Sequence, residues 1–307
     1  MDKTALIFPG QAAQVVGMGR AVAEAYEPAR AVLEQANDVL GFDLRGLCFE
    51  GPAERLSATD VQQPAIFATS VAIWEAVRSA GSGAARPAAA AGLSLGEYAA
   101  LYAGGSLSLA DGLRAVHERG RAMQAASRAR SGGMATLIGL DRSAVDDIVA
   151  RARGDDVLVA ANYLAGDLIV ISGDRAAVDR ACQLARDASG RVNPLDVAGA
   201  FHSPLMAPAA EALDEVLAGI EFKTTEMPVV SNVTGGYHDS AAGIRSLLAQ
   251  QLVSSVKWAD SIERLASDGC GHMIGIGPGS SQRSIIRRVD RSIRVSVVDS
   301  PADIEKL

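Results

Sequence analysis

A serine between two glycines, in Gly92-Leu93-Ser94-Leu95-Gly96, is the strongest candidate for chemistry in this chain. The G-x-S-x-G pattern is typical of a nucleophile elbow, a sharp strand-to-helix turn that presents a serine hydroxyl. Glycine is needed on both sides where neighbouring backbones pass too close for a Cβ atom. The N–H of Leu95 would lie at a helix start, where free N–H groups and the helix dipole stabilise an oxyanion. Ser94 is therefore the predicted nucleophile of an acyl-transfer reaction; the alternative is an ordinary Gly/Ser surface turn.

A serine nucleophile needs a general base, and the chain has four histidines. His117 falls in a predicted helix with charged neighbours, where a solvated position is expected. His238 lies in a polar turn and His272 just before a strand, and both fit structural roles. His202 lies in a loop at the seam between two predicted parts of the chain, where clefts form. The sequence favours His202, and the order serine then histidine is compatible because such sites are defined by geometry.

An arginine, Arg119, is a candidate for binding a substrate carboxylate. Burying a carboxylate is costly unless the charge is paired, and a guanidinium offers two parallel N–H donors that match it. The alternative is a surface position like that of three other arginines on the same predicted helix, namely Arg114, Arg121 and Arg128. Spacing alone gives Arg119 little preference over these, so both interpretations stay open at this point.

Composition indicates an ordinary soluble globular protein. The chain has 307 residues, 49% hydrophobic and 21% charged, enough to bury a large core. A net charge of −7 without a basic block argues against nucleic acid as a partner. No apolar run has the length of a membrane span and a strand-like segment follows Thr4 directly, so neither membrane nor signal peptide is expected. Three widely spaced cysteines fit reduced thiols in the cytoplasm, and no metal site is expected.

Strand-like and helical segments alternate along the chain, as in an α/β protein. Residues 132–197 follow the order strand, helix, strand, strand, helix, strand, which is the ferredoxin-like βαββαβ arrangement. We therefore predict a larger α/β domain from 1–127 and 199–307, with a small domain of 128–198 inserted. In the larger domain we predict helices at 20–40, 64–79, 96–104, 108–127, 204–218, 241–254, 257–268 and 280–289, and strands at 5–8, 88–91, 229–231, 273–276 and 294–298.

Eight segments in the same order resemble the malonyl-CoA:acyl carrier protein transacylase family, the acyltransferases of bacterial fatty-acid synthesis. The resemblance runs over the whole chain and implies an α/β-hydrolase-like core with a ferredoxin-like insertion. The matching segments are Phe8-Pro9-Gly10-Gln11, Val61-Gln62-Gln63-Pro64-Ala65, Ser94-Leu95-Gly96-Glu97-Tyr98, Glu118-Arg119-Gly120 with Met123-Gln124, Gly199 to Ser203, Ser231-Asn232-Val233-Thr234-Gly235, Gln251-Leu252 ahead of Val256-Lys257-Trp258, and Gly277-Pro278-Gly279.

The resemblance also implies catalytic roles. Ser94 would accept the acyl group and His202 would be the general base. The backbone carbonyl of Gln251 would orient the histidine, so that no aspartate is needed. The backbone N–H groups of Gln11 and Leu95 would form the oxyanion hole.

Further residues are implied in substrate binding. Arg119 would hold the free carboxylate of the malonyl group, with Gln63 supporting it. Asn162 matches an asparagine that helps to hold coenzyme A, in a turn that only partly resembles the family's. Phe201, beside the base, should crowd the α-carbon and favour malonyl over methylmalonyl. Leu93 stands where many members have histidine, outside the proposed base and oxyanion hole.

The expected function is transfer of malonyl from malonyl-CoA to the phosphopantetheine thiol of acyl carrier protein, by a ping-pong mechanism. The expected protein is a cytoplasmic monomer without a cofactor, whose partners are a coenzyme A thioester and acyl carrier protein. One alternative is a discrete trans-acting acyltransferase of a polyketide synthase, which has the same chemistry. A serine thioesterase or other hydrolase would share Ser94 and His202 but has no use for a buried Arg119. A non-catalytic carrier-binding module would tolerate loss of Ser94.

Overall fold

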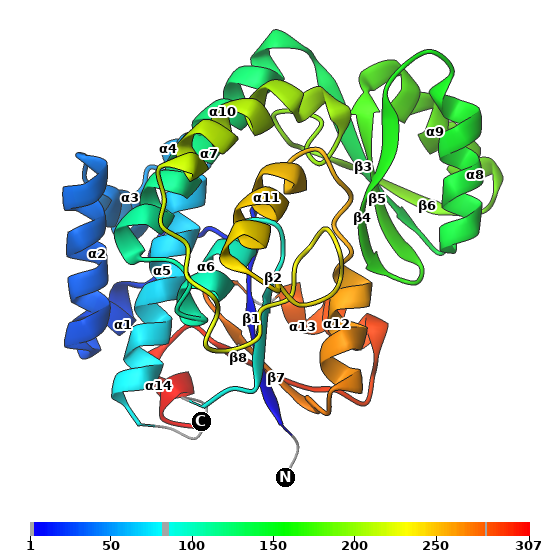
Figure 1. The fold of residues 1–307 in the computed structure, drawn as a ribbon. Helices are drawn as coiled ribbons and strands as arrows, with labels where there is room; N and C mark the ends of the chain where they lie inside the picture. Colours follow the sequence, from blue (N-terminus) through cyan, green and yellow to red (C-terminus); the bar gives the residue numbers. More distant parts are fainter. Residues whose placement is uncertain (1–2, 82–85, 280) are drawn as a thin grey trace.

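The computed structural model describes residues 3–81, 86–279 and 281–307, and within them the chain forms two separate β-sheets (Figure 1). The first is parallel, with strand order β2-β1-β7-β8, and the second is antiparallel, with order β4-β5-β3-β6. This confirms the α/β class. The strands are β1 Thr4–Phe8, β2 Ala89–Gly92, β3 Gly132–Ile138, β4 Leu158–Ala165, β5 Leu168–Asp174, β6 Arg191–Leu195, β7 His272–Ile276 and β8 Arg294–Val298.

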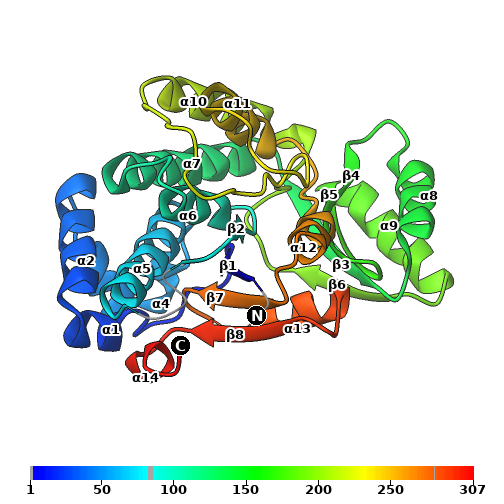
Figure 2. The same ribbon diagram turned by 60° about the horizontal axis from the view of Figure 1, so that its bottom comes forward.

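Helices surround the parallel sheet and cover the outer face of the antiparallel one (Figure 2). Among the described helices, none combines the length and apolarity needed to cross a bilayer. The helices are α1 Arg20–Ala25, α2 Glu27–Leu40, α3 Leu44–Glu50, α4 Ala53–Leu56, α5 Thr59–Ser79, α6 Gly96–Ala103, α7 Leu109–Ala129, α8 Arg142–Arg153, α9 Arg175–Asp187, α10 Ala207–Ala218 (after a 3₁₀ turn at Pro204–Met206), α11 Ala241–Gln251, α12 Trp258–Ser267, α13 Ser281–Val289 and α14 Pro301–Ile304.

The parallel sheet is buried on both faces, as the apolar run in β1 indicates. Successive side chains of a strand point to opposite faces. Leu6 and Phe8 therefore pack in the core shared with α5, α6 and α7, whereas Ala5 and Ile7 pack against α12 and α13. The alanine-rich segment predicted as a strand is β2, which pairs with β1. This sheet places the turn after β2 in the middle of the molecule.

The antiparallel sheet lies between the main body and two helices of its own, α8 and α9. Its β4 strand joins the main body through backbone hydrogen bonds at Val256, whose N–H donates to Ala161 O at 2.8 Å. The chain enters this sheet at Gly132 and leaves it after Leu195. The returning chain passes beside the entry, because a Cβ on Gly132 would lie 2.6 Å from Ala200 Cβ. The order of elements is the one predicted, and the division at 128 and 198 stays a prediction.

The stretch 20–40 is helical as predicted, but it forms two helices, α1 and α2, in place of one. Tyr26 between them is extended, with φ −127° and ψ 117°. Proline inside a helix removes a hydrogen bond and clashes with the preceding turn, but it is tolerated in the first turn. The chain therefore starts a new helix just before Pro28.

The predicted helix at 64–79 starts earlier, at Thr59, and contains Pro64. Proline at this position leaves the carbonyl of Asp60 without its usual helical donor. The ring of His117 fills that place, with Nδ1 3.0 Å from Asp60 O. His117 is consequently half-buried and structural, which corrects the solvated position expected for it.

The strand predicted at 229–231 is also wrong, because Val229 and Val230 form only isolated bridges, to Ala90 and Tyr237. Ser231 starts a turn instead, in which its carbonyl accepts from Gly235 N at 2.9 Å. This turn directs the next residue, Asn232, beneath the serine elbow. The short helices α3, α4 and α14 were not predicted, and residue 280, the expected start of α13, lies outside the described residues.

Candidate active site

The turn after β2 has the geometry of a nucleophile elbow. Ser94 has φ +51°, a conformation that L-residues adopt only where the surrounding structure holds them in it. A Cβ on Gly92 would lie 1.9 Å from the carbonyl carbon of Gly96, and one on Gly96 would lie 2.4 Å from Phe8 O. Both flanking glycines are therefore required by close backbone approach, as the pattern predicts.

Ser94 and His202 are in direct contact. Ser94 Oγ lies 2.8 Å from His202 Nε2, and His202 Nδ1 lies 2.9 Å from the carbonyl oxygen of Gln251. A carbonyl oxygen only accepts, so the proton of the neutral imidazole is on Nδ1 and Nε2 accepts from the serine hydroxyl. The structure thus brings together the three residues expected to form the nucleophile, its base and the group that orients the base.

The imidazole is held in its neutral, basic form. His202 is only 5% exposed. Burial lowers its pKa to about 4, and the nearby positive charge of Arg119 contributes to this lowering. Both effects disfavour the imidazolium. The other three histidines form no hydrogen bond with Ser94: His117 contacts Asp60, His238 contacts Glu97 and His272 contacts Ser296.

Arg119 is fully buried directly behind Ser94. Its Nη2 donates to Ser94 Oγ and to Gln251 Oε1, both at 3.0 Å, and its Nη1 donates to Gln63 Oε1 at 2.7 Å. A surface position for Arg119 is therefore wrong. Burial lowers its pKa, with Tyr98 and Glu97 opposing the shift, and a guanidinium stays charged at neutral pH. Among the described residues, no carboxylate forms an ion pair with it.

A cavity of about 570 Å³ opens in front of Ser94, at the seam between the two sheets. Gln11, Asn162 and Phe201 line it together with Ser94 and His202. The buried Arg119 contacts this lining through Ser94 Oγ. Gln63 is held by Met123, whose Sδ accepts from Gln63 Nε2 at 3.2 Å. The cleft predicted from the position of His202 is present.

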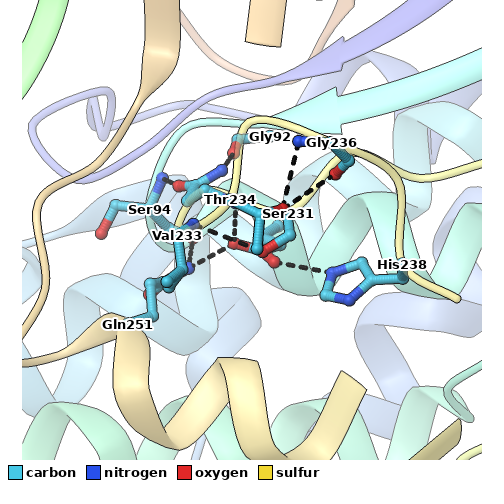
Figure 3. Close-up of polar contacts among 10 residues, drawn as sticks. Gly92, Ser94, Ser231, Val233, Thr234, Gly236, His238 and Gln251 are labelled. Carbon is cyan, nitrogen blue, oxygen red and sulfur yellow. Dashed lines mark hydrogen bonds and ion pairs between the residues drawn. The ribbon is translucent and has the colours of Figure 1, made fainter. Parts of the chain in front are cut away.

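Sequence reasoning missed the residues beneath the elbow (Figure 3). Asn232 Oδ1 accepts from Ser94 N at 2.5 Å, and its Nδ2 donates to Gly92 O at 2.7 Å. Gln251 contributes its side chain as well as its carbonyl, since its Nε2 donates to Ser94 O at 3.1 Å. The Ser-Asn-Val-Thr-Gly match pointed to this segment without assigning Asn232 a role.

Acylation of Ser94 by acetyl-CoA should be constant near neutral pH and fall only as the pH approaches about 4, the pKa of His202. The reason is that the expected base is the neutral imidazole, which is lost when the pH falls below its pKa. In Arg119→Ala the fall should move to higher pH, because a cation that lowers this pKa is removed. The measurement is the single-turnover rate of acylation across pH in the unchanged protein and in Arg119→Ala, with circular dichroism at each pH to verify folding. A fall centred at the ordinary histidine value of 6.5 in the unchanged protein would contradict the account.

Within the described residues, no cluster of histidine, cysteine and acidic side chains could hold a metal ion. A serine in hydrogen-bond contact with a histidine, beside a cavity, is an arrangement that acyl transfer requires. The geometry therefore suits a covalent acyl-serine mechanism.

Comparison with known proteins agrees with this chemistry. Residues 5–299 match the acyl transferase domain. The malonyl CoA-acyl carrier protein transacylase of Bacillus subtilis is 38% identical, with 99% of this chain and 96% of the relative covered. The crystal structure of an acyl carrier protein S-malonyltransferase from Vibrio cholerae superposes with a TM-score of 0.96 at 35% identity, covering 99% of both chains. A complex of a type II PKS acyl-carrier protein with its malonyl-transacylase gives 0.95 at 35% identity, over 99% of this chain and 98% of that one. The chain therefore belongs to the malonyl-CoA:acyl carrier protein transacylase family of acyltransferases.

Proposed function

We propose that the protein transfers malonyl from malonyl-CoA to the phosphopantetheine thiol of acyl carrier protein, through a malonyl ester on Ser94. His202 Nε2 takes the Ser94 proton as Oγ attacks the thioester carbonyl. The oxyanion is bound by the backbone N–H groups of Gln11 and Leu95. The tetrahedral intermediate expels the coenzyme A thiolate, which takes the proton from His202. The carrier thiol then attacks the ester with His202 again as base, and no cofactor is needed.

The observation that carries this proposal is a buried arginine at the nucleophile without a carboxylate partner among the described residues. A buried unpaired charge is costly, and the free carboxylate of a malonyl group would pair with it. Gln63, bonded to Nη1, fixes the guanidinium for that contact. A thioesterase or other hydrolase that acts on uncharged acyl groups gains nothing from Arg119.

The relatives support the two substrates. The Bacillus subtilis relative is named for malonyl CoA and acyl carrier protein, and the complex described above contains an acyl-carrier protein. Use of a polyketide carrier protein would leave every step at Ser94 unchanged. Acyl carrier protein is therefore the partner class proposed here.

The cavity residues have secondary roles in the proposal. Phe201 lies beside the base and borders the cavity, so it would crowd a methyl group on the α-carbon of the donor. Asn162 borders the same cavity from β4 and would contact coenzyme A. We further propose that the parallel sheet with its serine elbow is an α/β-hydrolase-like core. The strand order β4-β5-β3-β6 with two helices on one face supports a ferredoxin-like second unit.

Arg119→Ala should lower kcat/KM for malonyl-CoA, because the malonyl carboxylate then lacks its charge-assisted partner. The loss of transition-state stabilisation calculated from the two kcat/KM values should be about 2–5 kcal/mol. Acetyl-CoA has no carboxylate, so its slow reaction should persist or rise. Arg119→Lys should recover only part of the loss, since an ammonium lacks the planar pair of donors. The measurement is kcat/KM for both donors in the unchanged protein and both variants.

The matched control is Arg114→Ala on the same helix, where the arginine forms an exposed ion pair with Asp111. This variant should leave both kcat/KM values unchanged. Equal losses for malonyl-CoA and acetyl-CoA in Arg119→Ala would mean that Arg119 is structural and does not bind the malonyl carboxylate.

A further inference from the structure

A buried carboxylate lies beneath the site without touching the reacting atoms. Glu97 is in the first turn of α6, three residues after the nucleophile, and is only 1% exposed. Burying a carboxylate is costly unless hydrogen bonds satisfy it. Its Oε2 accepts from Gln251 Nε2 at 2.6 Å and from Asn232 N at 3.2 Å, and its Oε1 contacts His238 Nε2 at 2.8 Å.

The two residues that donate hydrogen bonds to Glu97 Oε2, Asn232 and Gln251, also form hydrogen bonds with the residues of the site. Asn232 binds the elbow through Ser94 N and Gly92 O. Gln251 orients His202 through its carbonyl and binds Ser94 O and Arg119 through its side chain. Figure 3 shows the dashed contacts that run from Gln251 at one side of this cluster to His238 at the other.

We infer that Glu97 is a positioning residue for acyl transfer: its carboxylate fixes Gln251 and Asn232, and through them the geometry of Ser94 and His202. The inference rests on the proposed function. His238 fixes the carboxylate from the far side and is therefore part of the same support. Arg119 is bonded to Gln63 as well as to Gln251, so losing Glu97 leaves the guanidinium one of its supports. The expected effect of losing Glu97 is on the rate of acylation rather than on binding of malonyl-CoA.

The pair Glu97→Ala and Glu97→Gln tests this inference. Glu97→Ala removes the acceptor of Asn232 N and one of the two acceptors of Gln251 Nε2. It should slow acylation of Ser94 at saturating malonyl-CoA by about 10–100-fold, as misplaced catalytic groups do. KM should change by less than about threefold. Glu97→Gln can place its oxygen toward Gln251 and Asn232 and donate to His238 Nε2, so acylation should stay within about threefold of the unchanged protein.

The tautomer of the His238 ring reports whether its hydrogen bond to residue 97 is formed, which a measurement of folding stability does not show. A carboxylate oxygen accepts, so His238 Nε2 donates to Glu97, whereas the amide nitrogen of Glu97→Gln would donate to Nε2 and leave the ring proton on Nδ1. Nitrogen-15 NMR of the ring distinguishes the two tautomers. The control is Glu75→Ala, which removes another largely buried carboxylate that contacts α6 through Tyr102 but no site residue. It should lower the unfolding temperature without changing acylation.

Three results would overturn the inference: acylation by Glu97→Ala at the unchanged rate, Glu97→Gln as slow as Glu97→Ala, or a slowing by Glu75→Ala equal to that by Glu97→Ala. If Glu97→Ala does not fold, Glu97→Asp replaces it, because the shorter side chain draws the carboxylate away from Gln251 and should still slow acylation at least about tenfold. If the unchanged protein forms no malonyl-serine at all, the proposed function fails instead, so the two failures are distinct.

Discussion

Replacing Ser94 by alanine should reduce malonyl transfer by about 10⁴-fold or more, to the level of the uncatalysed exchange. The variant keeps the cavity, Arg119 and His202, but it has no oxygen that can form the acyl ester. Malonyl transfer to carrier protein and the presence of an acyl adduct are measured together. Both should be lost.

The matched control is Ser261→Ala, which removes another buried serine hydroxyl, bonded to Lys257 O and not part of the cavity lining. Transfer should be unchanged in that variant. Transfer by Ser94→Ala through a serine-linked adduct at a different position would mean that the nucleophile is another serine.

His202→Ala should lower the acylation rate by about 10²–10⁴-fold, the usual contribution of a positioned general base. The loss arises because the Ser94 proton has no acceptor at 2.8 Å. Pre-steady-state acylation by malonyl-CoA measures it. In His117→Ala the rate should be nearly unchanged, although the helix carbonyl of Asp60 loses its partner. A large loss in His117→Ala with a nearly unchanged rate in His202→Ala would mean that His117, and not His202, is the base.

The parts of the site that the sequence predicts are those with a local cause. The glycines around Ser94 follow from the sharpness of one turn, and the structure shows a Cβ excluded at both positions. His202 follows from its position at a seam. The role of Arg119 could not be chosen from spacing, because four arginines share α7 and only tertiary packing buries one of them against Ser94.

The residues that support the site from beneath are far apart in the sequence, and only tertiary packing brings them together. Asn232 is 138 positions from Ser94, and His238 is 141 positions from Glu97. No periodicity or propensity brings such residues together. From the sequence, Asn232 and Glu97 were therefore seen only in matches to family segments, and His238 only as a histidine in a polar turn. The same holds for Pro64, whose helix persists because His117 from another helix satisfies Asp60 O. The alanines of 88–91 favour a helix by propensity alone. The strand predicted there is confirmed from Ala89 onward by its pairing with β1.

The most direct test of covalent malonyl transfer is the mass of the protein after brief exposure to malonyl-CoA without carrier protein, followed by addition of carrier protein bearing the phosphopantetheine thiol. We predict one added malonyl group, on the peptide that contains Ser94, which then disappears as malonyl appears on the carrier. Absence of an adduct, an adduct on another residue, or release of the group only as free malonate would contradict the account.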